Sequence, residues 1–105
     1  MTRNSVAAVW LADYRIFETA AFLEDLGDIP ASKRESLRAK LEGYVYPLLR
    51  QAPREHPQAR ALRGYAPKAW RWRIGDWRVF YHIDDSDRTV LIFGLSLRRD
   101  AYPRP

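Results

Sequence analysis

The sequence contains no cysteine, which excludes disulfides and thiolate metal sites. Its two histidines, His56 and His82, lie far apart in the chain, so no histidine cluster for a metal is indicated. The five glycines form no phosphate-binding loop, and no serine lies in a nucleophile elbow. No apolar run approaches the roughly 20 residues of a membrane helix, and the N-terminus does not resemble a secretory signal. We therefore expect a cytoplasmic protein without metal, cofactor or membrane contact.

The composition is that of one small folded domain. Hydrophobic residues make up 47% of the 105 residues and aromatic residues 13%, enough for a single core. We expect one domain over residues 1–105, with an N-terminal extension at 1–12 and a short tail at 103–105. There is no internal repeat or long linker.

The positive charge is confined to the second half of the chain. Residues 1–59 carry equal numbers of basic and acidic side chains, so residues 60–105 hold the whole net charge of +5. Nine of the ten basic residues in that half are arginine, the exception being Lys68. Arginine binds phosphate in a bidentate manner and stacks on bases, so this half favours a nucleic-acid partner. A solvated basic surface, or one that binds an acidic protein, is the alternative.

Residues 70–83 read WRWRIGDWRVFYHI and predict a β-hairpin. Each half alternates in side-chain direction, and the central Gly75-Asp76 suits a two-residue type II′ turn. That turn would set Ile74 opposite Trp77 and Arg73 opposite Arg78. One face would then carry Trp70, Trp72, Ile74, Trp77, Val79, Tyr81 and Ile83, and the other, here called the arginine face, would carry Arg71, Arg73, Arg78, Phe80 and His82. Like charges directly opposite cost about 0.2–1 kcal/mol, so stability does not explain the arginines, whereas binding a polyanion would.

The rest of the chain predicts helices before the hairpin and one strand after it. Residues 14–18 suit a strand, and Thr19 suits the N-cap of a short helix over 20–26 that Gly27 stops. Ser32 and Glu35 have capping-box spacing at the start of a second helix. The buried side of that helix is predicted from 3-4-3 spacing, and Pro47 should kink or end it. The predicted buried set is Leu37, Leu41, Tyr44, Val45 and Leu48.

Residues 51–68 read as a connection, 84–87 as an acidic turn, and 89–96 as a central strand that is apolar on both faces. The expected fold is α+β, with two N-terminal helices packed on a small antiparallel sheet.

An arginine set with one histidine and nearby tyrosines suits metal-free RNA cleavage. In that reaction the ribose 2′-OH attacks its own phosphate, and the protein must move two protons and stabilise the charge that develops on phosphorus. Arginine serves the electrostatic need well and proton transfer badly, since it hardly deprotonates.

Three segments resemble the RelE/ParE toxins of bacterial type II toxin–antitoxin modules. They are LRGY at 62–65, WRWRIGDWRVFYHID at 70–84 and RRDAY at 98–102, and the resemblance extends over about residues 13–102. It implies a RelE-like fold and an antitoxin that wraps the toxin. Members of the RelE branch cut mRNA in the ribosomal A site, whereas members of the ParE branch poison DNA gyrase.

The resemblance also implies site residues. The basic residues of the first strand match Arg71 and Arg73, the arginine after the turn matches Arg78, and the terminal aromatic matches Tyr102. The late basic position matches Arg98 or Arg99. The candidate catalytic residues are Arg73, Arg78, His82, Arg98, Arg99 and Tyr102, and the candidate RNA-binding residues are Arg63, Lys68, Arg71, Arg73 and Arg78.

Two departures from the family pattern keep the function open. Many cleaving members have lysines where this chain has Arg71 and Arg73, and a histidine where it has Leu97. The missing histidine at Leu97 favours a gyrase inhibitor without nuclease activity, or an inactive member that only binds RNA or antitoxin. The tail ending in Tyr102 favours the mRNA endonuclease. The residues also have structural interpretations: the tryptophans as core or antitoxin-groove residues, His82 as a structural residue, and the Arg98–Arg99 pair as a solvated tail.

Overall fold

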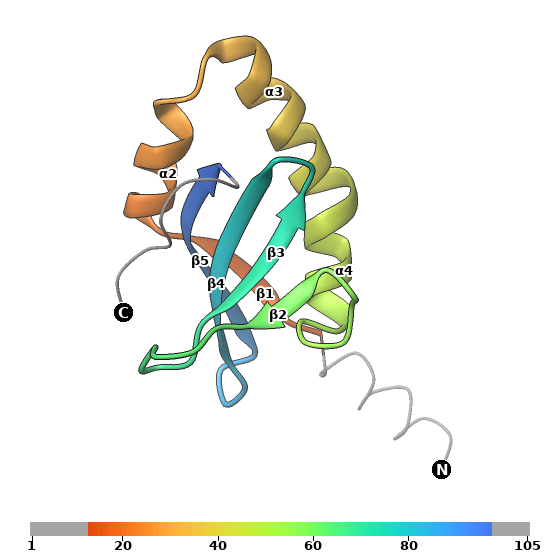
Figure 1. Ribbon diagram of the computed structural model, residues 1–105. Coiled ribbons are helices and arrows are strands. Elements are labelled where there is room, and N and C mark those ends of the chain that lie inside the picture. The colour runs from red at the N-terminus through yellow and green to blue at the C-terminus, as the bar shows by residue number, and fades with distance from the viewer. Residues whose placement is uncertain (1–12, 98–105) are drawn as a thin grey trace, which may run out of the picture.

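A computed structural model describes residues 13–97 and gives an α+β fold with a five-stranded sheet (Figure 1). The strand order is β1-β5-β4-β3-β2. The strands are β1 (Arg15–Glu18), β2 (Ala59–Ala61), β3 (Trp70–Ile74), β4 (Trp77–Asp84) and β5 (Thr89–Leu97). The helices are α2 (Ala20–Gly27) and a longer one made of α3 (Ala31–Lys40), the π-helical turn η1 (Leu41–Val45) and α4 (Tyr46–Gln51). The expected extension at 1–12 and tail at 103–105 lie outside the described residues.

Two parts of the expected fold were wrong. The helices are not the first elements of the described chain, because β1 precedes them. The strand that was expected at residues 14–18 is thus present. The sheet is also not purely antiparallel, since β1 pairs with β5 in parallel, with Ile16 opposite Val90. A parallel pair needs a long crossover, and both helices and the other three strands lie between these two strands in the chain. Among residues 13–97, no helix is long and apolar enough to cross a membrane.

The hairpin has the register that the turn predicted. Ile74 pairs with Trp77 and Arg73 with Arg78, while Gly75 has a φ of 57°. A type II′ turn needs a positive φ at its first central residue, which explains the glycine there. The predicted faces of β3 and β4 are therefore confirmed.

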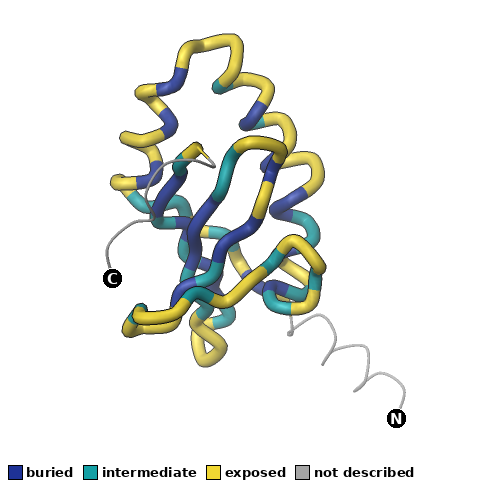
Figure 2. Tube along the Cα trace, in the orientation of Figure 1, coloured by how far each residue is buried: buried dark blue, intermediate teal, exposed yellow. Residues whose placement is uncertain are grey.

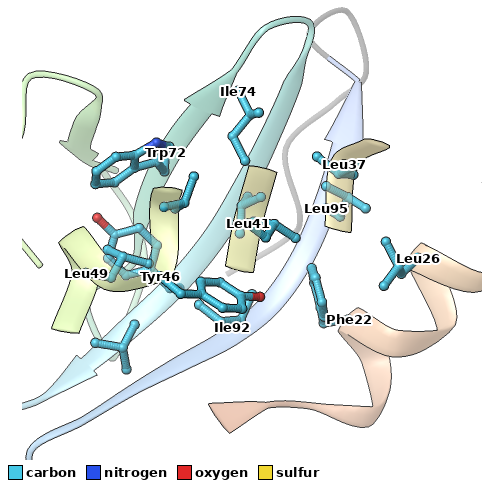
Figure 3. Close-up of a cluster of buried hydrophobic side chains, with 14 of the residues drawn as sticks. Phe22, Leu26, Leu37, Leu41, Tyr46, Leu49, Trp72, Ile74, Ile92 and Leu95 are labelled. Carbon is cyan, nitrogen blue, oxygen red and sulfur yellow. The ribbon is translucent and has the colours of Figure 1, made fainter. Parts of the chain in front are cut away.

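The core lies between the helices and the face of the sheet opposite the arginine face. Trp72 is 1% exposed and packs in one cluster with side chains from both helices and from β5 (Figure 3). Figure 2 shows the middle of the sheet buried and the hairpin turn exposed. Trp70 and Trp77 are half-buried and pack against this cluster. The interpretation of the tryptophans as packing residues is thus confirmed for Trp72.

The first helix is capped as predicted, and the second is not. The Thr19 hydroxyl accepts a hydrogen bond from the Phe22 N–H at 3.2 Å. The capping box at Ser32 and Glu35 was wrong, because the helix begins at Ala31 with Pro30 as N-cap and no side-chain cap. The 51–68 connection also contains β2, whose three residues are too few to show a strand pattern.

The second helix continues past Pro47 by way of the π-helical turn. Within η1 the Tyr46 N–H bonds to the Leu41 carbonyl, five residues back. This wider turn adds one residue to the helical repeat, so the 3.6-residue period does not hold within the turn or across it. The predicted burial of Tyr44, which lies within the turn, was wrong: Tyr44 is 55% exposed and Tyr46 is buried instead. Leu48 is only partly buried, whereas Leu49 is fully buried.

Candidate nucleic-acid interface

A cross-strand row near the hairpin turn holds the two arginines that the turn was expected to bring together. Arg73 pairs with Arg78, and Arg78 pairs on its other side with Ser96 of β5. Arg73 is exposed and Arg78 is half-buried. The Ser96 hydroxyl is buried and has no hydrogen-bond partner among the described residues. The row therefore places two guanidinium groups on a single face. The group of Arg73 is exposed and can donate to a phosphate, whereas the Ser96 hydroxyl and the Nε and Nη1 atoms of Arg78 are buried.

Arg71 occupies the next position along the arginine face and is held by the fold. It is only 9% exposed, and its Nη1 donates to the Gln58 carbonyl at 3.1 Å. This bond ties β3 to the segment before β2. Its cross-strand neighbour Phe80 is fully buried, with its ring 6.3 Å from that of Phe93. Arg71 thus has a structural role whatever else it binds.

His82 lies at the other end of the arginine face from the arginine pair. Its Nδ1 is 2.8 Å from the Lys68 carbonyl, and its ring stacks on Phe93 with centroids 4.3 Å apart. A carbonyl only accepts, so Nδ1 carries the proton and Nε2 is the acceptor nitrogen of the neutral ring. Four residues of strand separate His82 from Arg78, about 13 Å along β4. The two therefore do not meet at one phosphate.

The remaining predicted contacts lie in the loop between β2 and β3 or outside the described residues. Arg63 and Lys68 are exposed in that loop, which the Leu62 N–H closes on the Ala69 carbonyl at 2.9 Å. The Lys68 ammonium sits 5.6 Å from the centre of the Trp70 ring. Arg98, Arg99 and Tyr102 fall outside the described residues. They follow β5 directly in the chain, and β5 ends at Leu97 opposite Trp77, beside the arginine pair.

Acidic side chains gather at the far end of the same strands. The hydrogen bond from Arg54 (2.5 Å), followed by that from Tyr14 (2.5 Å), lowers the pKa of the Asp85 carboxyl. Bonds from the Ser86 hydroxyl and the Asp87 N–H lower the pKa of Asp84 in the same way. The sheet is thus polarised, with its negative charge at the β4–β5 turn and its arginine pair at the β3–β4 turn. In residues 13–97, no group of three or more possible ligands could hold a metal ion.

Sequence reasoning missed two neighbours of the arginine pair. Ser96 was treated only as the end of an apolar strand, and nothing in the sequence paired it with Arg78. Tyr44 was assigned to the core, although it is exposed and its hydroxyl lies 3.4 Å from His56 Nε2. The exposure of Tyr44 follows from the π-helical turn η1, and a regular 3.6-residue helical period does not predict that turn.

Comparison with known proteins identifies the family. The model of a family described as the ParE toxin of the type II toxin–antitoxin system, parDE, matches residues 12–102. RelE1 of Methanocaldococcus jannaschii, a proposed toxin, is 31% identical over 83 residues, which cover 79% of this chain and 88% of that protein. The chain belongs to the RelE/ParE toxin superfamily. It is the toxin component of a type II toxin–antitoxin module.

Solved structures of this superfamily have the same fold. The RelBE2 toxin–antitoxin complex of Mycobacterium tuberculosis matches with a TM-score of 0.66 and 24% identity, covering 84% of this chain and 94% of that one. The RelE–RelB complex of Pyrococcus horikoshii matches with a TM-score of 0.54 and 27% identity, and the match covers 85% of this chain and 99% of that one. The isolated RelE toxin of E. coli matches with a TM-score of 0.59 and 20% identity, and the match covers 84% of this chain and 87% of that one. The RelE-like fold expected from the resemblance is thereby confirmed.

Proposed function

We propose that this toxin is a ribosome-dependent, metal-free mRNA endonuclease. The observation that carries the proposal is the Arg73–Arg78 pair, which the hairpin holds side by side on the arginine face. Guanidinium groups placed side by side form charge-assisted, bidentate hydrogen bonds with phosphate oxygens, which an RNA backbone supplies. The similarity of this chain to RelE proteins also supports the proposal that its arginine face binds RNA.

In this proposal the arginine pair holds the scissile phosphate while the ribose 2′ oxygen attacks phosphorus and the bond from phosphorus to the 5′ oxygen of the next nucleotide breaks. The 2′-OH loses one proton and the departing 5′ oxygen gains one, so the products are a 2′,3′-cyclic phosphate and a 5′-OH. Preorganised guanidinium groups stabilise the charge that develops on the phosphoryl oxygens, which is commonly the largest single contribution to catalysis. Arg98 or Arg99 completes the phosphate site, and Tyr102 orients the ribose or a base. Arg63, Lys68 and Arg71 are assigned to flanking RNA, with His82 about 13 Å along β4 from the pair.

We further propose that the partner in the cell is a RelB-type antitoxin. The structures from M. tuberculosis and P. horikoshii are complexes of RelE-type toxins with their antitoxins. The net charge of +5 suits an acidic segment that folds on binding and covers the arginine face.

The second candidate function is inhibition of DNA gyrase without RNA cleavage. It is favoured by the distance between His82 and the arginine pair, which leaves the described part of the site without a general base beside the phosphate. A member that only binds RNA or antitoxin is the remaining alternative.

One experiment distinguishes these three candidate functions. The toxin is induced in a bacterial host, and mRNA ends on ribosomes and plasmid supercoiling are measured in the same cultures. The endonuclease proposal predicts new mRNA ends within A-site codons and unchanged supercoiling. Arg73→Ala and Arg78→Ala should abolish the cuts, whereas Arg50→Ala, which removes an exposed arginine from α4, should keep them. Altered supercoiling without cuts would establish the gyrase inhibitor, and neither effect would establish the inactive member.

A further inference from the structure

A pocket of about 290 Å³ opens beside the arginine pair, between the second helix and the edge of β3. β2 pairs with β3 only as far as Trp72, so within residues 13–97 no strand pairs with that edge beyond this position. One water molecule occupies about 30 Å³, so the pocket has room for about ten waters, or for one flat group the size of a nucleobase. Its lining side chains of interest are Lys40, Tyr44, Gln58, Trp72 and Arg73.

Tyr44 is presented to this pocket by the π-helical turn. Tyr44 lies within η1 on the side of the helix away from the core, and this large aromatic residue is 55% exposed. The ring is nonetheless held in place. It meets His56 edge-on with centroids 6.2 Å apart, and His56 stacks on the buried Trp72 at 4.4 Å. An exposed ring fixed by a buried stack is a preorganised surface for another flat group.

The tautomer of His56 fixes the Tyr44 hydroxyl as well. The Gln58 N–H donates to His56 Nδ1 at 3.1 Å, so in the neutral ring the proton is on Nε2. Nε2 then donates to the Tyr44 oxygen at 3.4 Å. The same Gln58 has its backbone carbonyl bound by Arg71, so its backbone is anchored on both sides at a position that lines the pocket.

Two cations line the pocket. Lys40 and Arg73 are both exposed, and no acidic residue is among the lining residues that the structure describes. Gln58 adds an amide, which can donate to and accept from the edge of a base. Cations, an aromatic ring and an amide together are the groups with which proteins bind single-stranded nucleic acid.

We propose that this pocket binds the base of an RNA nucleotide next to the one whose phosphate lies at Arg73 and Arg78. Tyr44 stacks on the base, Gln58 contacts its edge, and Lys40 neutralises the following phosphate. Arg73 belongs to both sites, which joins them into one continuous track. The inference deepens the proposed function and rests on it for the orientation of the RNA.

An acidic peptide is the competing occupant. It would use Lys40 and Arg73, but it would gain little from a fixed ring or from the amide of Gln58. RNA uses all four groups, which is why we favour it.

The test measures binding of RNA trinucleotides to the full chain by NMR, following the backbone amides of Tyr44, Gln58 and Gly75. Removing a stacked aromatic weakens binding by about 5- to 150-fold, so Tyr44→Ala should do so while Tyr44→Phe should not. Leu23→Ala, which removes an exposed apolar side chain from α2, is the control and should leave binding unchanged. Gln58→Ala should change the preference among the four bases.

Lysine variants test the phosphate contact. Lys40→Ala should reduce the slope of log affinity against log salt by about one, as expected for one lost phosphate contact. Lys33→Ala removes the same charge from the same helix, about 10 Å away, and should leave the slope unchanged.

The two proposals fail in different ways. If the toxin cuts mRNA but Tyr44→Ala binds and cuts with the same affinity and base preference, the pocket proposal is overturned and the nuclease stands. If trinucleotides shift the pocket amides but no mRNA is cut, the pocket stands and the nuclease proposal is overturned. If trinucleotides leave these amides unshifted while an Asp/Glu-rich peptide shifts them, the pocket binds protein and the RNA proposal for it is wrong.

Discussion

At the scale of single residues, stability does not explain the position of Arg73. It is exposed, and its cross-strand neighbour has the same charge. We predict that Arg73→Ala changes the free energy of unfolding by less than about 0.5 kcal/mol, or raises it slightly, because an unfavourable pair is lost. The same variant should lose most growth inhibition, since one transition-state contact is worth about 2.7–4 kcal/mol. Urea unfolding and growth assays measure the two effects, and an unstable but fully toxic variant would contradict this assignment.

Trp72 is predicted to behave in the opposite way. It is 1% exposed and supports the His56 ring, so Trp72→Ala should cost about 3–5 kcal/mol of folding free energy. Trp70→Ala, at a half-buried position on the same strand, should cost less. Denaturant unfolding of both variants checks the order, and equal costs would mean that the core is not centred on Trp72.

At the scale of elements, the π-helical turn determines which tyrosine is structural. Tyr46 is buried and donates to Glu18 at 2.6 Å, and Arg38 also binds this carboxylate. Tyr46→Phe should therefore destabilise the protein by about 1.5–3 kcal/mol, the range for a hydrogen bond to a charged group. Tyr44→Phe, two residues away, should have almost no effect on stability. Thermal unfolding of this matched pair tests the helix phase, and the reverse order would place the turn elsewhere.

The elements that could be predicted are those defined by local chemistry. The hairpin register follows from a two-residue turn with glycine first, and the start of α2 follows from Thr19. The parallel pairing of β1 with β5 could not be predicted, because it joins segments more than 70 residues apart. The π-helical turn η1 could not be predicted, because Pro47 indicates that the helix is interrupted but does not show whether it kinks, ends or forms a wider turn. For the site, the arginine pair was predicted from register, whereas Ser96 and Tyr44 required the sheet order and the helix phase.

At the scale of the whole molecule, two buried tyrosines set an alkaline limit to stability. Burial, and for Tyr46 also the bond to Glu18, raises the pKa of Tyr46 and of Tyr81. A raised pKa in the folded state means that the proton is held more tightly than in the unfolded chain. The contribution of these tyrosines to the free energy of unfolding is therefore fully present below a pH of about 10, and it is lost as the pH rises above that value. Thermal unfolding between pH 8 and 12 should show this fall, and Tyr46→Phe should show less of it. A flat profile in the wild type would contradict the burial of these hydroxyls.

The polarised charge of the sheet also predicts how the whole protein binds RNA. Each phosphate contact releases counterions, so affinity for ribosomes should fall steeply as salt rises from 50 to 200 mM. Arg50→Ala should keep the slope, whereas Arg78→Ala should reduce it by about one. Filter binding or sedimentation measures the slope, and an affinity independent of salt would show that the arginine face does not contact phosphate.

The central claim is that the arginine face cuts mRNA through the ribose 2′-OH. The most direct measurement adds the purified toxin to ribosomes programmed with an mRNA that carries either ribose or a single 2′-deoxyribose at the cut position. We expect the all-ribose message to be cleaved, with a 2′,3′-cyclic phosphate at the new end. The deoxy-substituted message should stay intact, and the Arg73→Ala toxin should cleave neither message. Cleavage that persists on the deoxy-substituted message, or an all-ribose message left intact by a folded toxin, would contradict it.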